Sequence, residues 1–104
     1  MSDIFDVSNI KDFSTEVFEM LLQNDKVRIE RIVSTGQAAP EGEWQDSEQN
    51  EWVILLQGES ELIFADGEII KITKGKYFYI PAHRKHRVTY TSSNPQCIWL
   101  AFHF

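Results

Sequence analysis

The chain has 104 residues, of which 42% are hydrophobic and 12% aromatic, so it is large enough for one folded domain and too apolar for a disordered segment. Its formal net charge of -6 argues against binding to a nucleic-acid backbone. The single cysteine, Cys97, permits no intrachain disulfide and is interpreted as a small core residue. The sequence has neither a signal peptide nor an apolar run as long as a membrane span, so we expect a soluble, cytoplasmic protein without a membrane partner.

Residues 1–26 are expected to form an N-terminal segment that packs on the rest of the chain. Within it, Ser14 or Thr15 can cap a helix. The apolar residues that follow at helical spacing are Val17, Phe18, Leu21 and Leu22. The pattern ends at Asn24 and Asp25, and we therefore predict a short amphipathic helix here.

From Val27 onward the apolar pattern changes from helical to strand-like. Short strands are predicted at 27–34, 51–57, 60–64, 69–73, 77–80, 87–90 and 98–104. Turn formers separate them, and Asp66-Gly67 is the strongest hairpin signal. Short strands at near-regular spacing predict an antiparallel sandwich or small barrel.

The predicted strand at 51–57, EWVILLQ, is apolar on both faces. Such a strand should be covered on both sides, by the opposite sheet and by the N-terminal segment or a second subunit. Its outward positions, Trp52, Ile54 and Leu56, favour a homodimer.

Three polar residues stand out as candidates for a site. His83 and His86 lie in a short basic loop after Pro81, which ends a strand because it brings no N–H to a sheet. The loop fits either a ligand-presenting corner or a solvated turn. Glu51 begins an apolar strand, so it is either an inward carboxylate that needs a partner or a rim carboxylate paired to a nearby base.

The loop also carries the spacing of a known sequence motif. Gly75, Pro81 and His86 follow the second motif of the cupin family. His83 stands in place of the motif glycine, and Tyr90 in place of the motif asparagine.

The first cupin motif is matched in its second half, by Glu51 and Gly58. Asp46 and Trp44 occupy the positions where that motif usually has histidines. Over residues 27–104, the chain therefore resembles a small single-domain cupin.

The resemblance implies an all-β, antiparallel cupin or jelly-roll barrel, here with a short N-terminal helix. In metal-binding cupins two histidines, a glutamate and the second-motif histidine hold one metal ion. The resemblance thus implies a divalent metal site, for Fe, Mn, Ni or Zn, with the candidate ligands Asp46, Glu51, His83 and His86. The residues expected to line the pocket are Trp44, Tyr90 and His103. His103 also fits a buried structural histidine.

Three functions remain open from the sequence. The first is a metal-binding cupin, with or without catalysis on a small molecule. The second is a metal-free cupin that binds a small ligand, which the missing first-motif histidines favour. The third is a dimeric structural module without catalysis. The fold alone does not decide among them.

Overall fold

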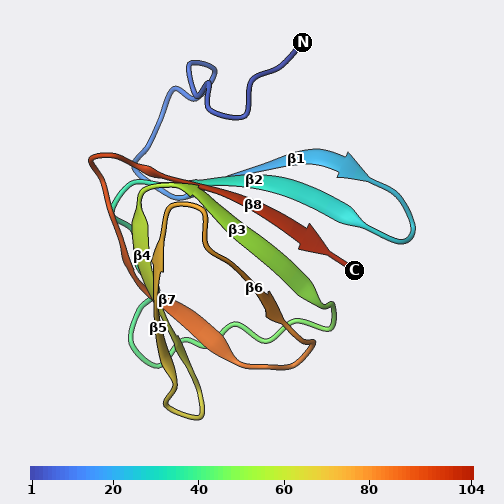
Figure 1. Ribbon diagram of the computed structural model, residues 1–104, viewed down its shortest axis with the longest axis vertical. Helices are drawn as coiled ribbons and strands as arrows, with labels where there is room; N and C mark the ends of the chain where they lie inside the picture. The colour runs from blue at the N-terminus through green and yellow to red at the C-terminus, as the bar shows by residue number, and fades with distance from the viewer.

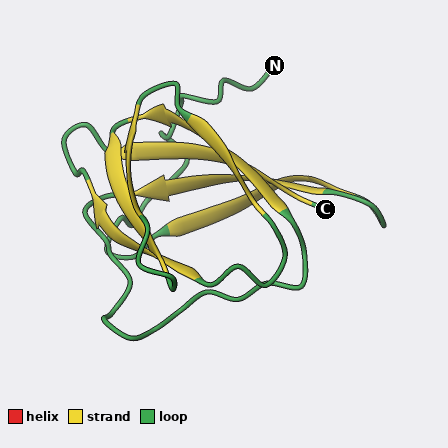
Figure 2. Ribbon diagram, turned by 60° about the horizontal axis from the view of Figure 1, so that its bottom comes forward, coloured by secondary structure: helices red, strands yellow, loops and turns green.

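A computed structural model describes all of residues 1–104, and its regular elements are all strands (Figures 1 and 2). They are β1 (Val17–Gln23), β2 (Arg28–Ser34), β3 (Glu51–Gln57), β4 (Glu59–Phe64), β5 (Ile69–Thr73), β6 (Tyr77–Ile80), β7 (His86–Thr91) and β8 (Cys97–His103). The predicted all-β antiparallel architecture is confirmed. No helix is present that could span a membrane.

The strands form two antiparallel sheets that face each other. One has five strands in the order β1-β2-β8-β3-β6, and the other has three in the order β5-β4-β7. Alternation places one face of each strand in the space between the sheets. The buried core there consists of Val53, Leu55, Leu62, Phe64, Ile72, Ile80, Cys97, Trp99 and Ala101. Cys97 is a fully buried core residue, as predicted.

The predicted N-terminal helix is wrong, because residues Val17–Gln23 form strand β1. β1 pairs with the free edge of β2, which satisfies the backbone groups that the two strands turn toward each other. The register shifts between Met20 and Leu22, so Leu21 is an extra residue without a partner. This bulge interrupts the two-residue alternation of the strand, and the resulting spacing of apolar residues imitates a helix.

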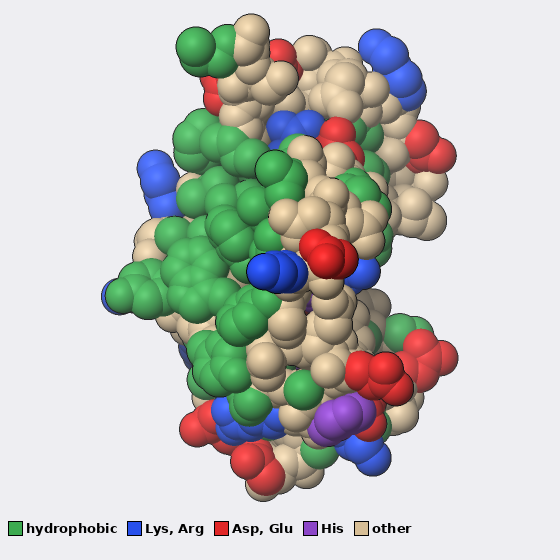
Figure 3. Space-filling model, turned by 90° about the vertical axis from the view of Figure 1, so that its right-hand side faces the viewer, with side chains coloured by type: hydrophobic (Ala, Val, Ile, Leu, Met, Phe, Trp, Pro, Cys, Tyr) green, Lys and Arg blue, Asp and Glu red, His purple; other side chains and the backbone are tan.

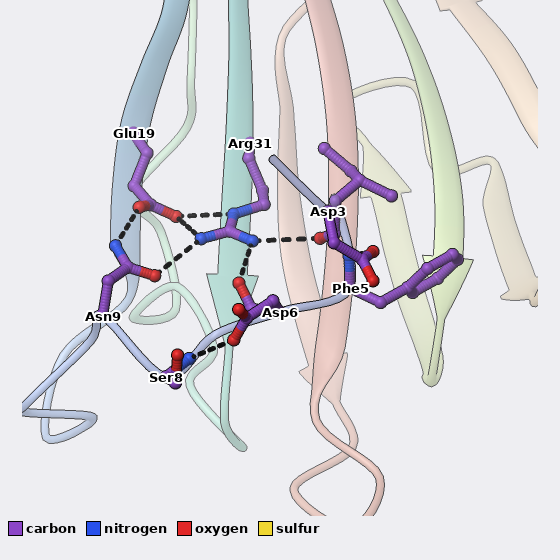
Figure 4. A network of polar contacts seen from close by, with 8 residues as sticks. Asp3, Phe5, Asp6, Ser8, Asn9, Glu19 and Arg31 are labelled. Carbon is purple, nitrogen blue, oxygen red and sulfur yellow. Dashed lines mark hydrogen bonds and ion pairs between the residues drawn. The ribbon is translucent and has the colours of Figure 1, made fainter. Parts of the chain in front are cut away.

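The segment before β1, residues 1–16, lies against the outer face of the five-stranded sheet and is anchored there by Arg31 of β2 (Figure 4). Arg31 is only 5% exposed. Its guanidinium is 2.6 Å from Glu19 on β1. It also donates hydrogen bonds to the carbonyl oxygens of Ile4 and Asp6 and to the side chain of Asn9. The buried charge is therefore both paired and fully hydrogen-bonded, as burial requires.

Gly58 joins β3 of one sheet to β4 of the other. Its φ is +92°, and a Cβ atom there would lie 2.8 Å from Ser92 Oγ and 2.9 Å from both Cα and Sγ of Cys97. The first-motif glycine is therefore required for two reasons, because other residues rarely adopt this positive φ and because the neighbouring atoms leave no room for a Cβ atom.

We expect Gly58→Ala to lower the free energy of unfolding by roughly 1–3 kcal/mol more than Gly67→Ala, because only the first substitution overpacks the core. Gly67 is a matched control, since its φ is +97° and nothing lies within 4 Å of the added atom. Urea unfolding of both variants checks this. Equal losses in the two variants would show that the close contacts at Gly58 are relieved without cost.

Candidate ligand-binding site

A pocket of about 400 Å³ lies between the two sheets, a volume that suits a small-molecule ligand. Its apolar lining includes Ile32, Val53, Leu62, Phe78, Ile80, Val88 and Trp99. Its polar lining includes Arg28, His103 and Glu51, which occupy matching positions on the adjacent strands β2, β8 and β3. His86, the first residue of β7, lines the same pocket from the three-stranded sheet.

Glu51 is a largely buried carboxyl group, and its side chain is 20% exposed. It lies on the same face of β3 as the buried residues Val53 and Leu55, as the alternation predicted. No protein group donates a hydrogen bond to it, and the nearest basic atom is His103 Nδ1 at 3.7 Å. Burial raises the pKa of Glu51, while His103 and His86 nearby oppose that rise. The protein thus leaves this carboxyl without a close partner of its own.

His103 connects Glu51 to a second acid. Its Nε2 is 2.7 Å from Oε1 of Glu30, and its side chain is only 10% exposed. The guanidinium of Arg28 lies 4.0 Å from the same oxygen of Glu30. When Glu30 is ionised, Nε2–H of His103 donates to it, and the other ring nitrogen faces Glu51. The structure therefore places His103 in the pocket lining and also gives it a structural partner.

His86 is 6% exposed, and its orientation is set by the backbone. Its Nδ1 lies 2.9 Å from the carbonyl oxygen of Arg84. Because a carbonyl oxygen only accepts, Nδ1 carries the proton in the neutral ring, and Nε2 is left as an acceptor. No protein group bonds to Nε2, so His86 offers a free acceptor at the pocket.

Asp46 and His83 form a separate pair at the exposed rim. Asp46 Oδ1 is 2.9 Å from His83 Nδ1, and the two side chains are 41% and 64% exposed. Asp46 reaches the pocket lining, whereas His83 does not. His83 has a φ of +65°, which explains why the family motif has glycine at this position. The pair ties the 35–50 loop to the turn between β6 and β7.

Trp44 and Tyr90, which we expected to line the pocket, are not among the residues that line this cavity. Trp44 packs with Arg87, whose guanidinium lies 5.2 Å from the centre of its ring. Tyr90 is turned away by a bulge. In the pairing of β7 with β4, Thr89 has no partner, so the alternation that turns His86 inward is interrupted before Tyr90.

As they lie, the donor groups do not fit a metal ion. No three His, Cys, Asp or Glu side chains are grouped closely enough to hold one. Asp46 is engaged with His83 at the rim, while Glu51 and His86 both line the pocket. The metal site therefore stays a prediction.

Sequence reasoning missed Arg28 and Glu30. Both lie in the strand that it did predict, VRIERIVS, and both line the pocket. The alternation of side chains along a strand could have identified them, because Arg28, Glu30 and Ile32 share one face of β2. Charged residues on the core side of a strand indicate a polar site.

Two facing antiparallel sheets around a small internal pocket define the class of cupin-type barrels. The family model described as Cupin domain matches residues 31–103, and the chain belongs to that family. No curated protein compared with the chain matches it in sequence.

Solved structures support this assignment. A protein from Ralstonia eutropha JMP134, proposed to be a mannose-6-phosphate isomerase, is 35% identical, with a TM-score of 0.90 and coverage of 99% of this chain and 95% of that one. An RmlC-like cupin with a double-stranded β-helix fold, from Methanocaldococcus jannaschii, is 24% identical, with a TM-score of 0.72 and coverage of 90% and 84%. The FeII form of HppE is 14% identical, with a TM-score of 0.71 and coverage of 86% and 50%. The last two likenesses show the fold alone, and the FeII form of HppE shows that this fold also occurs in a protein with bound iron.

We expect Glu51→Gln to stabilise the protein at pH 7 but not at about pH 4. The raised pKa of Glu51 in the folded state means that ionising it costs stability as the pH rises above its ordinary value of 4.5. Below that pH the carboxyl group is protonated in both states, and the neutral amide then has no advantage. Urea unfolding at both pH values measures the difference.

Glu48→Gln, a substitution in the exposed loop before β3, serves as the control and should change stability little at either pH. A Glu51→Gln variant that is less stable than the parent at pH 7 would contradict the expected cost of burying the carboxylate.

Proposed function

We propose that this cupin binds a small, hydroxyl-bearing molecule in the pocket between its sheets, through Glu51 and His86. The observation that carries the proposal is that both side chains are largely buried, line one cavity and present acceptor atoms that no protein group hydrogen-bonds. Buried polar groups in native proteins are almost always hydrogen-bonded. A bound molecule that donates hydrogen bonds would satisfy both residues.

The pocket's chemistry favours a polyol or sugar-like ligand. Hydroxyl groups donate to acceptors such as Glu51 and His86 Nε2, while the apolar lining suits the carbon skeleton. Arg28 at the polar wall can pair with an anionic substituent such as a phosphate. The description of the Ralstonia protein as a proposed mannose-6-phosphate isomerase supports the same ligand class.

Proton transfer on the bound molecule is the chemistry that this pair of residues would serve. Burial raises the pKa of Glu51 above its ordinary value, and a raised carboxyl pKa is typical of groups that exchange a proton with a substrate. In the neutral ring of His86, Nε2 is an acceptor in the same pocket, and it can take up a proton.

Metal binding is the second candidate. The observation behind it is that Glu51 and His86, which occupy cupin ligand positions, line the same pocket, although no third donor is grouped with them. A divalent ion bound there would supply Lewis-acid chemistry to a substrate. Elemental analysis after exposure to Fe, Mn, Ni and Zn salts separates the candidates, since about one retained ion per chain, lost in His86→Ala, would favour the metal site.

A thermal-shift screen of sugars, sugar phosphates and hydroxy acids tests the ligand-binding proposal. We expect at least one compound to raise Tm by roughly 10 °C or more at about 100 times its Kd, because that excess adds about 2.7 kcal/mol of stability. Glu51→Gln and His86→Gln should each abolish the shift.

Glu48→Gln is again the control, because it lies outside the pocket lining and should keep the full shift. The proposal fails if no compound stabilises the protein, or if the stabilising compound raises the Tm of both pocket variants as much as that of the parent protein.

A further inference from the structure

The guanidinium group of Arg28 lines the pocket, and the protein provides no acceptor for its N–H groups. Its Nε is buried and has no hydrogen-bond partner. Its acidic contact, at 4.0 Å to Oε1 of Glu30, is too long for a hydrogen bond. That oxygen already lies 2.7 Å from Nε2 of His103. Arg28 therefore brings to the pocket a positive charge and a fork of donors that the protein does not satisfy.

Arg84, the other arginine of the pocket lining, is satisfied within the chain. One of its terminal nitrogens lies 2.8 Å from Oε1 of Glu68 and 3.6 Å from Oδ2 of Asp66. Its Cζ lies 3.6 Å from the centre of the Phe64 ring. Of the two arginines, Arg28 is thus the one whose charge is available to a bound molecule.

The other acids of the pocket lining do not compensate Arg28, because each lies closer to another group. Glu16 accepts a hydrogen bond from Ser34. Asp46 is engaged in the rim pair described above, and the basic atom nearest to Glu51 belongs to β8. The pocket therefore holds one cationic group without a close anion.

The surface of the protein does not attract large anions. The formal net charge is -6, and on the side shown in Figure 3 the Lys and Arg side chains lie apart from one another, mostly near acidic ones. A polyanion finds no broad basic face there. The charge of Arg28 thus suits a single acid group of a small molecule that enters the pocket.

The strand registers separate Arg28 from Glu51 across the polar wall. Both are paired with His103, which lies between them on β8. Two strand spacings of about 4.8 Å put roughly 10 Å between their backbone positions. A ligand that reaches both side chains is therefore extended, with its acid group at the end remote from the hydroxyl group that meets Glu51.

We propose that Arg28 determines the specificity of the pocket, selecting a polyol chain that ends in a carboxylate or phosphate group. The guanidinium fork can form two parallel, charge-assisted hydrogen bonds with such a group. A neutral polyol leaves the same donors without an acceptor and so binds more weakly. The inference rests on the proposed binding of a hydroxyl-bearing molecule, to which it adds the charge of the ligand and the place of that charge.

Isothermal titration calorimetry with three compounds of the same carbon chain tests the role of Arg28. They are glucitol, gluconate and glucitol 6-phosphate, compared at constant ionic strength. We expect at least one of the two acids to bind the parent protein roughly 10-fold or more tightly than glucitol, and Arg28→Gln to remove most of that ratio. The stronger of the two acids identifies the preferred group as a carboxylate or a phosphate.

Arg87→Gln is the matched control, because it removes the same charge from a residue outside the pocket lining. Arg87 also has a buried Nε without a partner, but its guanidinium packs on Trp44. This variant should keep the full ratio. If Arg28→Gln does not fold by circular dichroism, Arg28→Lys takes its place and should lower the ratio several-fold, since it keeps the charge but loses the fork.

Glucitol that binds the parent protein as tightly as both acids, or a ratio that survives in the Arg28 variant, overturns the role of Arg28 and leaves the proposed ligand class intact. If none of the three compounds binds, inorganic phosphate is the probe, followed by phosphorus NMR. Binding to the parent protein that is lost in Arg28→Gln would then support an anion site at Arg28 and count against a polyol ligand. No binding of phosphate either would overturn the anion site as well.

Discussion

The structure depends on how one carboxylate is accommodated at the start of a core strand. Glu51 shares its face of β3 with Val53 and Leu55, so the strand cannot join the core without carrying the carboxyl group with it. An uncompensated buried charge is costly, and the basic group nearest to Glu51 is His103 on the adjacent strand β8. His103 is in turn held by Glu30, so a polar wall spans three strands above an otherwise apolar interior.

The protein pairs the carboxyl group of Glu51 less closely than it pairs that of Glu30. Glu30 and His103 form a close pair, whereas Glu51 has a neighbour at 3.7 Å and no hydrogen bond. A protein that needed only stability would place an amide or an apolar residue there. The retained, poorly satisfied acid, together with the free nitrogen of His86, is what gives the pocket its chemical character.

Much of the fold followed from the sequence, because alternation and turn residues are local signals. Two differences between the expected and the observed structure have a common cause, which is the β-bulge. An unpaired Leu21 made strand β1 resemble a helix, and an unpaired Thr89 misplaced Tyr90. A bulge depends on which residue pairs with which across the sheet, and a single sequence does not reveal this.

The site was predicted less completely, because motif positions do not specify contacts. Glu51 and His86 were found from the motif, and the structure places both in the pocket lining. Asp46 and His83, which lie on loops, pair with each other at the rim, and Trp44 packs on Arg87. Loop geometry of this kind is set by tertiary packing and not by local sequence preference.

The three tryptophans lie in three different regions of the protein, namely the pocket, the outer face of the five-stranded sheet and the 35–50 loop. Trp99 lines the pocket, Trp52 lies on the outer face of the five-stranded sheet, and Trp44 lies on the 35–50 loop. Each indole senses a different environment, with Trp99 only 5% exposed and Trp44 38% exposed. Intrinsic fluorescence, with one tryptophan retained at a time, would therefore report separately on the pocket, on the outer face of the sheet and on the 35–50 loop, without an added label.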